Sequence, residues 1–253
     1  MESIYSQVYA ELYRQHWWWR VRESLILERL RQLELPGSPP AILDVGCGEG
    51  LFFDRLTELG DVWGVEPAPV APDEPWGGRI FTGTFGSAFE PGRRFSLILM
   101  LDVLEHIENA EAALRHALRL LEPGGSIVIT VPAFRALWTS HDTLNHHFTR
   151  YTSRSFRALA DRAGMNIHSM RYFFHWLFPL KLMVRGFERL TGRPPRPPAM
   201  PPHWVNQVLM RFCMLEQAVT RRLRVPFGSS LLIIGTHASP ERTMPAPFAD
   251  ADA

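Results

Sequence analysis

The sequence predicts an α/β protein with a doubly wound, seven-stranded mixed sheet, an N-terminal helical segment and a helical insertion before the last strand. Short apolar runs alternate with segments of helical periodicity from residue 41 onward. A glycine-rich loop follows the first of these runs. A chain of 253 residues, 46% of them hydrophobic, can bury one sizeable core that carries an insertion.

Composition limits the partners and the compartment. The chain has 27 basic and 26 acidic residues, so no overall field attracts nucleic acid, and any such partner would need a local patch. Only Cys47 and Cys213 are present, too far apart for a disulfide framework or a cysteine zinc site. No leader and no apolar run of ~20 residues is found. We therefore expect a cytoplasmic protein without a transmembrane segment.

The chain is expected to open with a helix over residues 3–33, which PGSPP then breaks. Beyond it, strands and helices alternate, as in a parallel sheet covered by helices. The predicted strands are 41–45, 61–66, 79–83, 95–101, 126–132, 165–172 and 229–238, and the predicted helices between them are 51–59, 111–121 and 153–164. Proline and glycine crowd residues 67–78, where we expect a short or missing helix.

Residues 173–228 form the predicted insertion. An apolar segment over 173–190 contains Pro179, which is expected to end or kink a helix, and charged residues that prevent it from crossing a bilayer. The segment could line an acceptor pocket, lie in a membrane interface or form a dimer face. The predicted units are a helical lid (1–40), a cofactor domain (41–172 with 229–240), this insertion and a flexible tail (241–253).

The loop after the first strand carries Gly46, Gly48 and Gly50, which lets the backbone approach a ligand closely. A dinucleotide fingerprint would place its third glycine where this chain has Leu51, so the spacing argues against NAD. Acidic residues gather at or near the predicted strand ends, where they would repel a pyrophosphate and attract a sulfonium cation. These residues are Asp44, Glu49, Glu66, Asp102 and Glu105.

Glu66 ends the second strand, 22 residues after Asp44. From this position a carboxylate can accept hydrogen bonds from both hydroxyls of an adenosine ribose. Glu66 is the most specific single assignment in the sequence.

Four motifs in succession, LDVGCGEG, VWGVEP, FSLILMLDVLEHI and LEPGGSIVITVP, resemble those of the Rossmann-like class I S-adenosylmethionine-dependent methyltransferases. The resemblance covers roughly residues 41–165, and PFGSSLLIIGTHA resembles the closing strand of that family. It implies methyl transfer from S-adenosylmethionine.

The resemblance also implies roles for individual residues. Gly46, Cys47 and Gly48 would line the methionine part, Asp44 would orient it, and Glu66 would hold the ribose. Leu101 would offer its carbonyl to the amino group and Asp102 would close the pocket floor. The expected cofactor-binding set is Asp44, Gly46, Cys47, Gly48, Gly50, Glu66, Thr84, Phe85, Leu101, Asp102 and Arg22.

Two of these assignments have weaker support in the motifs. Where the family often has an acid that bonds adenine, this chain reads Gly83, Thr84 and Phe85, so adenine recognition is assigned to Thr84 or to backbone. Arg22 follows three tryptophans, Trp17 to Trp19, and similar segments in the family fold over the cofactor. The helix is thus a candidate lid whose arginine pairs with the methionine carboxylate, or an amphipathic helix whose tryptophans belong to the core.

Acceptor chemistry is expected at DVLEHI, with Glu105, His106 and His146 as candidate catalytic residues. Here the chain resembles ubiquinone-pathway O-methyltransferases and small-RNA 2′-O-methyltransferases, in which an acid, Glu-His and a later His form a divalent metal site. Matching positions are Asp102, Glu105, His106 and His146. The alternative is that a histidine acts as a general base, and the sequence does not decide between a metal site and a base.

We therefore predict methyl transfer to a small-molecule acceptor, with a hydroxyl oxygen as the preferred target because of the histidines, and with a hydrophobic or lipid-like acceptor compatible with the insertion. The alternatives are N- or C-methylation, or a non-catalytic S-adenosylmethionine-binding protein. Nucleic acid is not expected as the acceptor, and the oligomeric state is not predicted.

Overall fold

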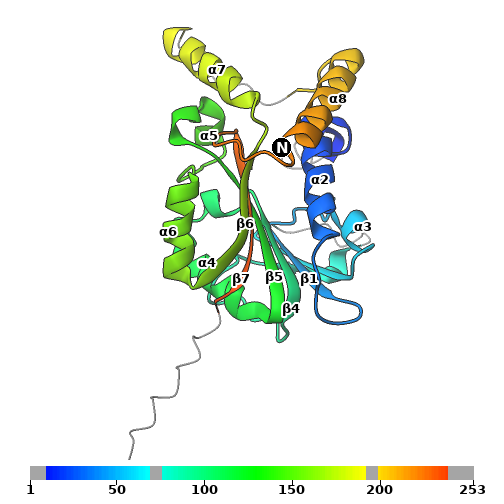
Figure 1. The fold of residues 1–253 in the computed structure, drawn as a ribbon. Helices are drawn as coiled ribbons and strands as arrows, with labels where there is room; N and C mark the ends of the chain where they lie inside the picture. Colours follow the sequence, from blue (N-terminus) through cyan, green and yellow to red (C-terminus); the bar gives the residue numbers. More distant parts are fainter. Residues whose placement is uncertain (1–9, 69–75, 192–198, 239–253) are drawn as a thin grey trace, which may run out of the picture.

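A computed structural model describes residues 10–68, 76–191 and 199–238. The predicted tail, 241–253, lies outside these residues, as does the start of the predicted lid. Seven strands form one sheet in the order β3-β2-β1-β4-β5-β7-β6, in which β7 runs antiparallel to both neighbours (Figure 1). The predicted seven-stranded mixed sheet with a helical insertion before the last strand is confirmed.

The strands follow the buried runs of the sequence. They are β1 (Ala41–Val45), β2 (Asp61–Glu66), β3 (Ile80–Thr82), β4 (Phe95–Leu101), β5 (Leu121–Pro132), β6 (Met165–Phe173) and β7 (Ser230–His237). All five residues of β1 are buried, because helices cover both faces of a parallel sheet. The short β3 lies at the edge of the sheet, beside β2.

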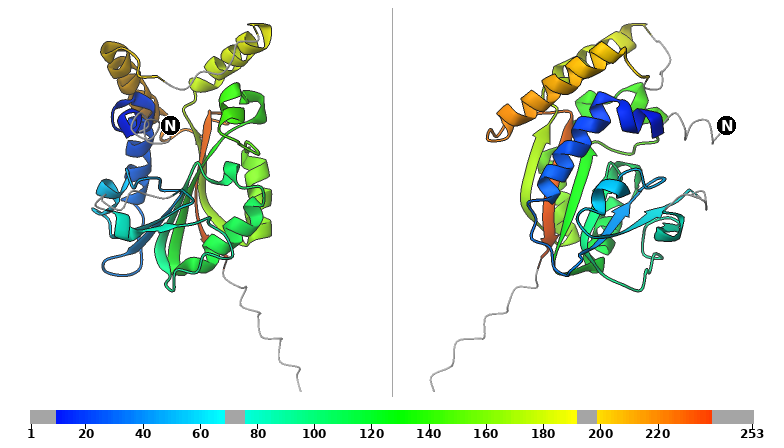
Figure 2. Two further views of the ribbon diagram at one scale, coloured as in Figure 1. Left: turned by 180° about the vertical axis from the view of Figure 1, so that it is seen from behind. Right: turned by 90° about the vertical axis from the view of Figure 1, so that its right-hand side faces the viewer.

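Helices cover the sheet on both faces, as two views of the ribbon show (Figures 1 and 2). One face carries α4 (Ala110–Leu120) and α6 (Ser153–Ala163), and the other carries α2 (Trp17–Leu30) and α3 (Phe53–Leu56). Each face has its own apolar cluster, in which Phe156 is fully buried on the first and Phe53 on the second.

Helix α2 belongs to the core. Trp17 packs against Phe174 and Trp176 with ring centroids 6.2 and 5.8 Å apart, and Trp18 stacks on Phe174. Eight of its residues are buried, Arg22 among them. The tryptophans therefore pack α2 against the segment that follows β6. Arg22 lies on the same helix and contacts the carboxyl ends of the central strands.

Several elements differ from expectation. The helix predicted over residues 3–33 is interrupted at His16, the N-cap of α2. The helix after the glycine loop is only α3, four residues long, and the polar loop after β5 contains a helix, α5 (Ser140–Leu144). Helix α7 (Leu177–Thr191) runs through Pro179, because proline in the first turn of a helix removes no intrahelical hydrogen bond. The predicted helix end at Pro179 was therefore wrong, since α7 continues to Thr191.

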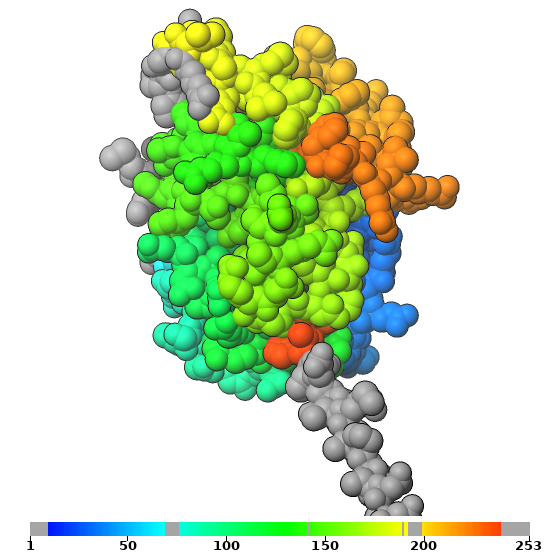
Figure 3. All heavy atoms as spheres, turned by 60° about the vertical axis from the view of Figure 1, so that its left-hand side comes forward, coloured from blue at the N-terminus to red at the C-terminus, as the bar shows by residue number. Residues whose placement is uncertain are grey.

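The carboxyl ends of β1, β2, β4 and β5 meet at one end of the sheet, and α7 and α8 (His203–Thr220) stand beyond that end (Figure 1). In the space-filling view α7 (yellow) and α8 (orange) project from the body of the molecule (Figure 3). None of the described helices is long and apolar enough to span a membrane.

Candidate functional site

The backbone of the glycine loop after β1 adopts a conformation that residues other than glycine would adopt only under strain. Gly46, Gly48 and Gly50 all have positive φ, at +71°, +55° and +74°. A Cβ on Gly46 would also lie 2.9 Å from Val103 Cγ2. The loop therefore turns tightly across the end of β1 and leaves its backbone accessible to a ligand.

Glu66, at the end of β2, is joined to this loop. Its Oε2 accepts a hydrogen bond of 2.9 Å from the backbone N–H of Gly48, and Oε1 accepts a longer one from Ala68. The carboxylate is half-buried. Two adjacent strand ends thus hold an acid in a fixed position.

Asp44 lies beneath the loop and is 5% exposed. Burial raises the pKa of its carboxyl to about 7, with Glu66 adding to the rise and Arg22 opposing it. A cation bound near this carboxyl would favour its ionised form.

Arg22 and Asp102 meet at the end of β4. Arg22 Nη2 lies 2.7 Å from Asp102 Oδ2 and donates a hydrogen bond to Thr130 Oγ1, which in turn donates to Asp102 Oδ1. Asp102 adopts φ +59°, a conformation that costs a non-glycine residue free energy and is often found at functional sites. Arg22 of α2 therefore lies at the carboxyl ends of β4 and β5, where it partly neutralises the charge of Asp102.

The remaining predicted cofactor residues have different surroundings. Cys47 is half-buried, and burial raises the pKa of its thiol, which makes it a poor nucleophile. Leu101 is half-buried at the end of β4. Thr84 is exposed, whereas Phe85 is buried in the apolar cluster beneath α4, against the ring of His116.

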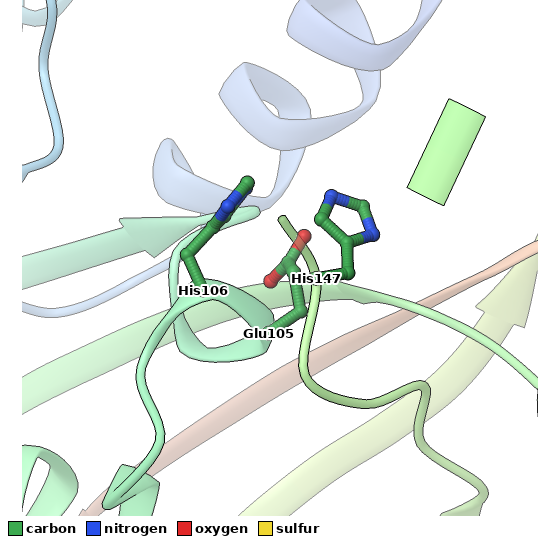
Figure 4. A group of neighbouring side chains, drawn as sticks. All are labelled: Glu105, His106 and His147. Carbon is green, nitrogen blue, oxygen red and sulfur yellow. The ribbon is translucent and has the colours of Figure 1, made fainter. Parts of the chain in front are cut away.

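Glu105, His106 and His147 converge beside Asp102, with their functional groups pointing toward one another (Figure 4). One ligand atom from each lies within 4.8 Å of the others, and the two imidazole rings are 4.5 Å apart, edge to face. Glu105 is 1% exposed, and its Oε2 has no hydrogen-bond partner among the described residues. Burial, followed by the charge of Asp102, raises its pKa.

A buried carboxylate orients His147. Asp142 is fully buried and accepts two hydrogen bonds from Arg150, of 2.7 and 2.9 Å, and one from the backbone of Thr139. His147 donates from Nδ1 to Asp142 Oδ1 at 2.8 Å, which leaves Nε2 as the basic nitrogen. Burial alone would raise the pKa of Asp142, but His147 and Arg150 hold it below its ordinary value.

The neighbouring His146 is exposed, with φ +55°, and is not among the three converging side chains. Burial, and then the charge of His147, lower the pKa of His106. Lys181 on α7 is near enough for the charges of Arg150 and Asp142 to act on it, and burial lowers its pKa to about 8.

The sequence analysis did not assign roles to Asp142, Arg150 or Thr130, nor single out His147. Two adjacent histidines in a polar loop give no signal of which one faces inward. Asp142 lies five residues before His147, a spacing that differs from the three or four residues at which side chains meet on a helix, so the spacing does not indicate this pair.

Residues 17–170 match the family model described as a methyltransferase domain. The ubiquinone biosynthesis O-methyltransferase of Azorhizobium caulinodans is 36% identical over 98 residues, which are 35% of this chain and 39% of that protein. The protein of the same name from Methylobacterium nodulans is 31% identical over 100 residues. The matched segments thus span about two fifths of these relatives.

Solved structures share the fold. An S-adenosylmethionine-dependent methyltransferase from Clostridium acetobutylicum superposes with a TM-score of 0.55 at 10% identity, over 94% of this chain and 99% of that one. A TehB-like S-adenosylmethionine-dependent methyltransferase from Corynebacterium glutamicum gives a TM-score of 0.53 at 19% identity, over 93% and 99%.

Proposed function

Since this chain belongs to the methyltransferase-domain family, we propose that it is an S-adenosylmethionine-dependent methyltransferase that methylates a hydroxyl oxygen of a small-molecule acceptor, with His147 as the general base. The observation that carries this proposal is the buried Asp142 bonded to His147 Nδ1, which directs Nε2 toward Glu105 and His106. The name of the O-methyltransferase relatives agrees with oxygen as the acceptor atom.

The cofactor lies across the ends of β1, β2 and β4 in this proposal. Glu66 accepts hydrogen bonds from the ribose hydroxyls. The loop of Gly46 to Gly50 makes room for the methionine part, and Asp44 faces the positive charge of the sulfonium. Arg22 binds the methionine carboxylate by sharing its guanidinium with Asp102. Cys47 and Leu101 line the methionine part, and Thr84 and Phe85 border the adenine.

In the reaction the acceptor oxygen attacks the methyl carbon, and its proton passes to His147 Nε2. The carbon–sulfur bond breaks with its electron pair on sulfur, which gives S-adenosylhomocysteine. Positioning supplies up to ~7 to 11 kcal/mol of the barrier reduction. Asp142 stabilises the imidazolium that forms, and Glu105 and His106 position the acceptor hydroxyl.

A divalent metal fits the same residues. Glu105 offers a buried oxygen without a hydrogen-bond partner among the described residues, and His106 and His147 offer ring nitrogens. These three side chains would hold the ion, with Asp102 and His146 as the neighbouring sequence candidates. A bound ion would lower the pKa of the acceptor hydroxyl.

The test is release of S-adenosylhomocysteine from S-adenosylmethionine and a panel of phenols, alcohols and amines. We expect turnover with hydroxyl acceptors, and a fall of about 10²- to 10⁴-fold in kcat for His147→Gln without loss of cofactor affinity. The same measurement on His146→Gln decides between the two adjacent histidines. Loss of activity with EDTA would replace the base with a metal, because His147 Nε2 cannot bind an ion and accept a proton at the same time. Turnover of amines alone would reject the proposal.

A further inference from the structure

Helix α7 turns the charged side chains of Arg185 and Glu188 toward the protein and a row of apolar side chains toward solvent. Arg185 donates hydrogen bonds to the backbone carbonyls of Arg135 and Ala136, and Glu188 accepts one of 2.8 Å from Ser140. On the opposite side an apolar stripe recurs at helical spacing. It consists of Leu180, Met183, Val184, Phe187 and Leu190, with Leu190 89% exposed.

Helix α8 likewise exposes a row of apolar side chains, although its inward face also carries the buried Cys213. Its inward face carries Asn206, which bonds the backbone at Gln15 and Trp17, and Glu216, which accepts from the backbone of Trp176. Its outward stripe has one large apolar residue every three or four positions. It consists of Trp204, Val208, Phe212, Leu215 and Val219, with Trp204 71% exposed. Soluble helices usually show the reverse pattern.

Charge distinguishes this segment from the rest of the chain. Residues 177–228 contain nine Lys and Arg but only two acids, Glu188 and Glu216, in a protein whose net charge is +1. Both acids are engaged in the inward hydrogen bonds just described. Arg211, Arg222 and Arg224 are exposed. The exposed charge of the segment is therefore cationic.

We propose that α7 and α8 dock the protein on an anionic lipid bilayer, with the apolar stripes in the interface and the arginines on the headgroups. Helices of this character bind at membrane surfaces through apolar burial combined with attraction to anionic lipid. A second copy of the chain fits less well, because it would bring two cationic segments together. The helices diverge at the end of the molecule where the strand ends meet, so docking turns the acceptor side toward the bilayer (Figures 1 and 3).

Co-sedimentation of the full chain with vesicles of phosphatidylcholine, with and without phosphatidylglycerol, tests this. We expect tight binding only to the anionic vesicles, weakened by salt. Phe187→Glu and Leu215→Glu should each weaken binding about tenfold or more, because each removes one apolar side chain from the interface. Ala158→Glu, the same charge change at an exposed position of α6, should bind as wild type.

Replacing Arg222 and Arg224 with glutamine should weaken binding to the anionic vesicles about fivefold per arginine. Circular dichroism of each variant confirms that the fold is retained. The proposal is overturned if the wild-type protein does not bind anionic vesicles. A dimer in light scattering that Phe187→Glu dissociates, together with no vesicle binding, would assign the apolar stripes to a contact between two copies of the chain. Because the assay contains no acceptor, such a result leaves the proposed methyl transfer intact.

Discussion

Two buried aspartates, one on each side of the site, differ in what compensates their charge. Asp44 on the cofactor side and Asp142 on the acceptor side are both buried, at 5% and 0% exposure. Burial raises the pKa of Asp44 to about 7, whereas His147 and Arg150 keep the pKa of Asp142 low. The acceptor side thus carries its own counter-charge, while the cofactor side gains one when a cation binds.

Removing the carboxylate of the acceptor side should have the largest effect. Asp142→Asn leaves the Arg150 guanidinium buried without its counter-charge, and we expect the free energy of unfolding to fall by about 3–5 kcal/mol in urea denaturation. Glu111→Gln is the matched control, since Glu111 pairs with two arginines, Arg115 and Arg162, at the surface. It should leave the free energy of unfolding nearly unchanged, because solvent screens exposed ion pairs. An equal fall in the free energy of unfolding for Asp142→Asn and Glu111→Gln would contradict this difference between a buried and an exposed ion pair.

On the cofactor side, Glu66→Gln should act on binding and leave the fold intact. Loss of a charged acceptor for the ribose hydroxyls should weaken S-adenosylhomocysteine binding about 10- to 100-fold in calorimetry. Glu90→Gln, an exposed acid outside the crevice, should change nothing. Unchanged affinity for Glu66→Gln would remove this residue from the cofactor site.

The contrast also predicts a pH dependence for the cofactor. Below pH 7 Asp44 holds a proton that a bound cation must displace, so the affinity for S-adenosylmethionine should rise about tenfold per pH unit toward pH 7 and level off above it. Asp44→Asn should bind more weakly and lose this dependence. A wild-type affinity that is flat between about pH 6 and pH 8 would contradict the account.

The smallest effect is expected at Cys47, whose thiol pKa burial raises. Cys47→Ala should change kcat less than about threefold, and alkylating reagents should leave the native thiol unmodified. Rapid alkylation would show that Cys47 forms a reactive thiolate despite its burial, which contradicts this prediction.

The residues proposed for the cofactor lie at strand ends for a physical reason. Gly46 and Asp102 directly follow strands and Glu66 ends one, and the carboxyl ends of parallel strands lie at one end of the sheet, so order along the chain determines position in space. Only the role of each residue then had to be assigned.

The rest depended on orientation that no periodicity encodes. His146 and His147 are adjacent, and the five-residue helix α5 with its buried Asp142 decides which one turns inward. The sequence showed an apolar segment over 173–190, but such a pattern does not say which face of a helix meets the protein. Inward hydrogen bonds of Arg185 and Asn206 settle that point.

A crystal structure of the S-adenosylhomocysteine complex tests the central claim most directly, because it locates the sulfur from which the methyl group leaves. The account predicts the ribose on Glu66 and the sulfur facing the group formed by Glu105, His106 and His147. A sulfur facing away from that group, with Asp102 between them, would contradict the proposed mechanism.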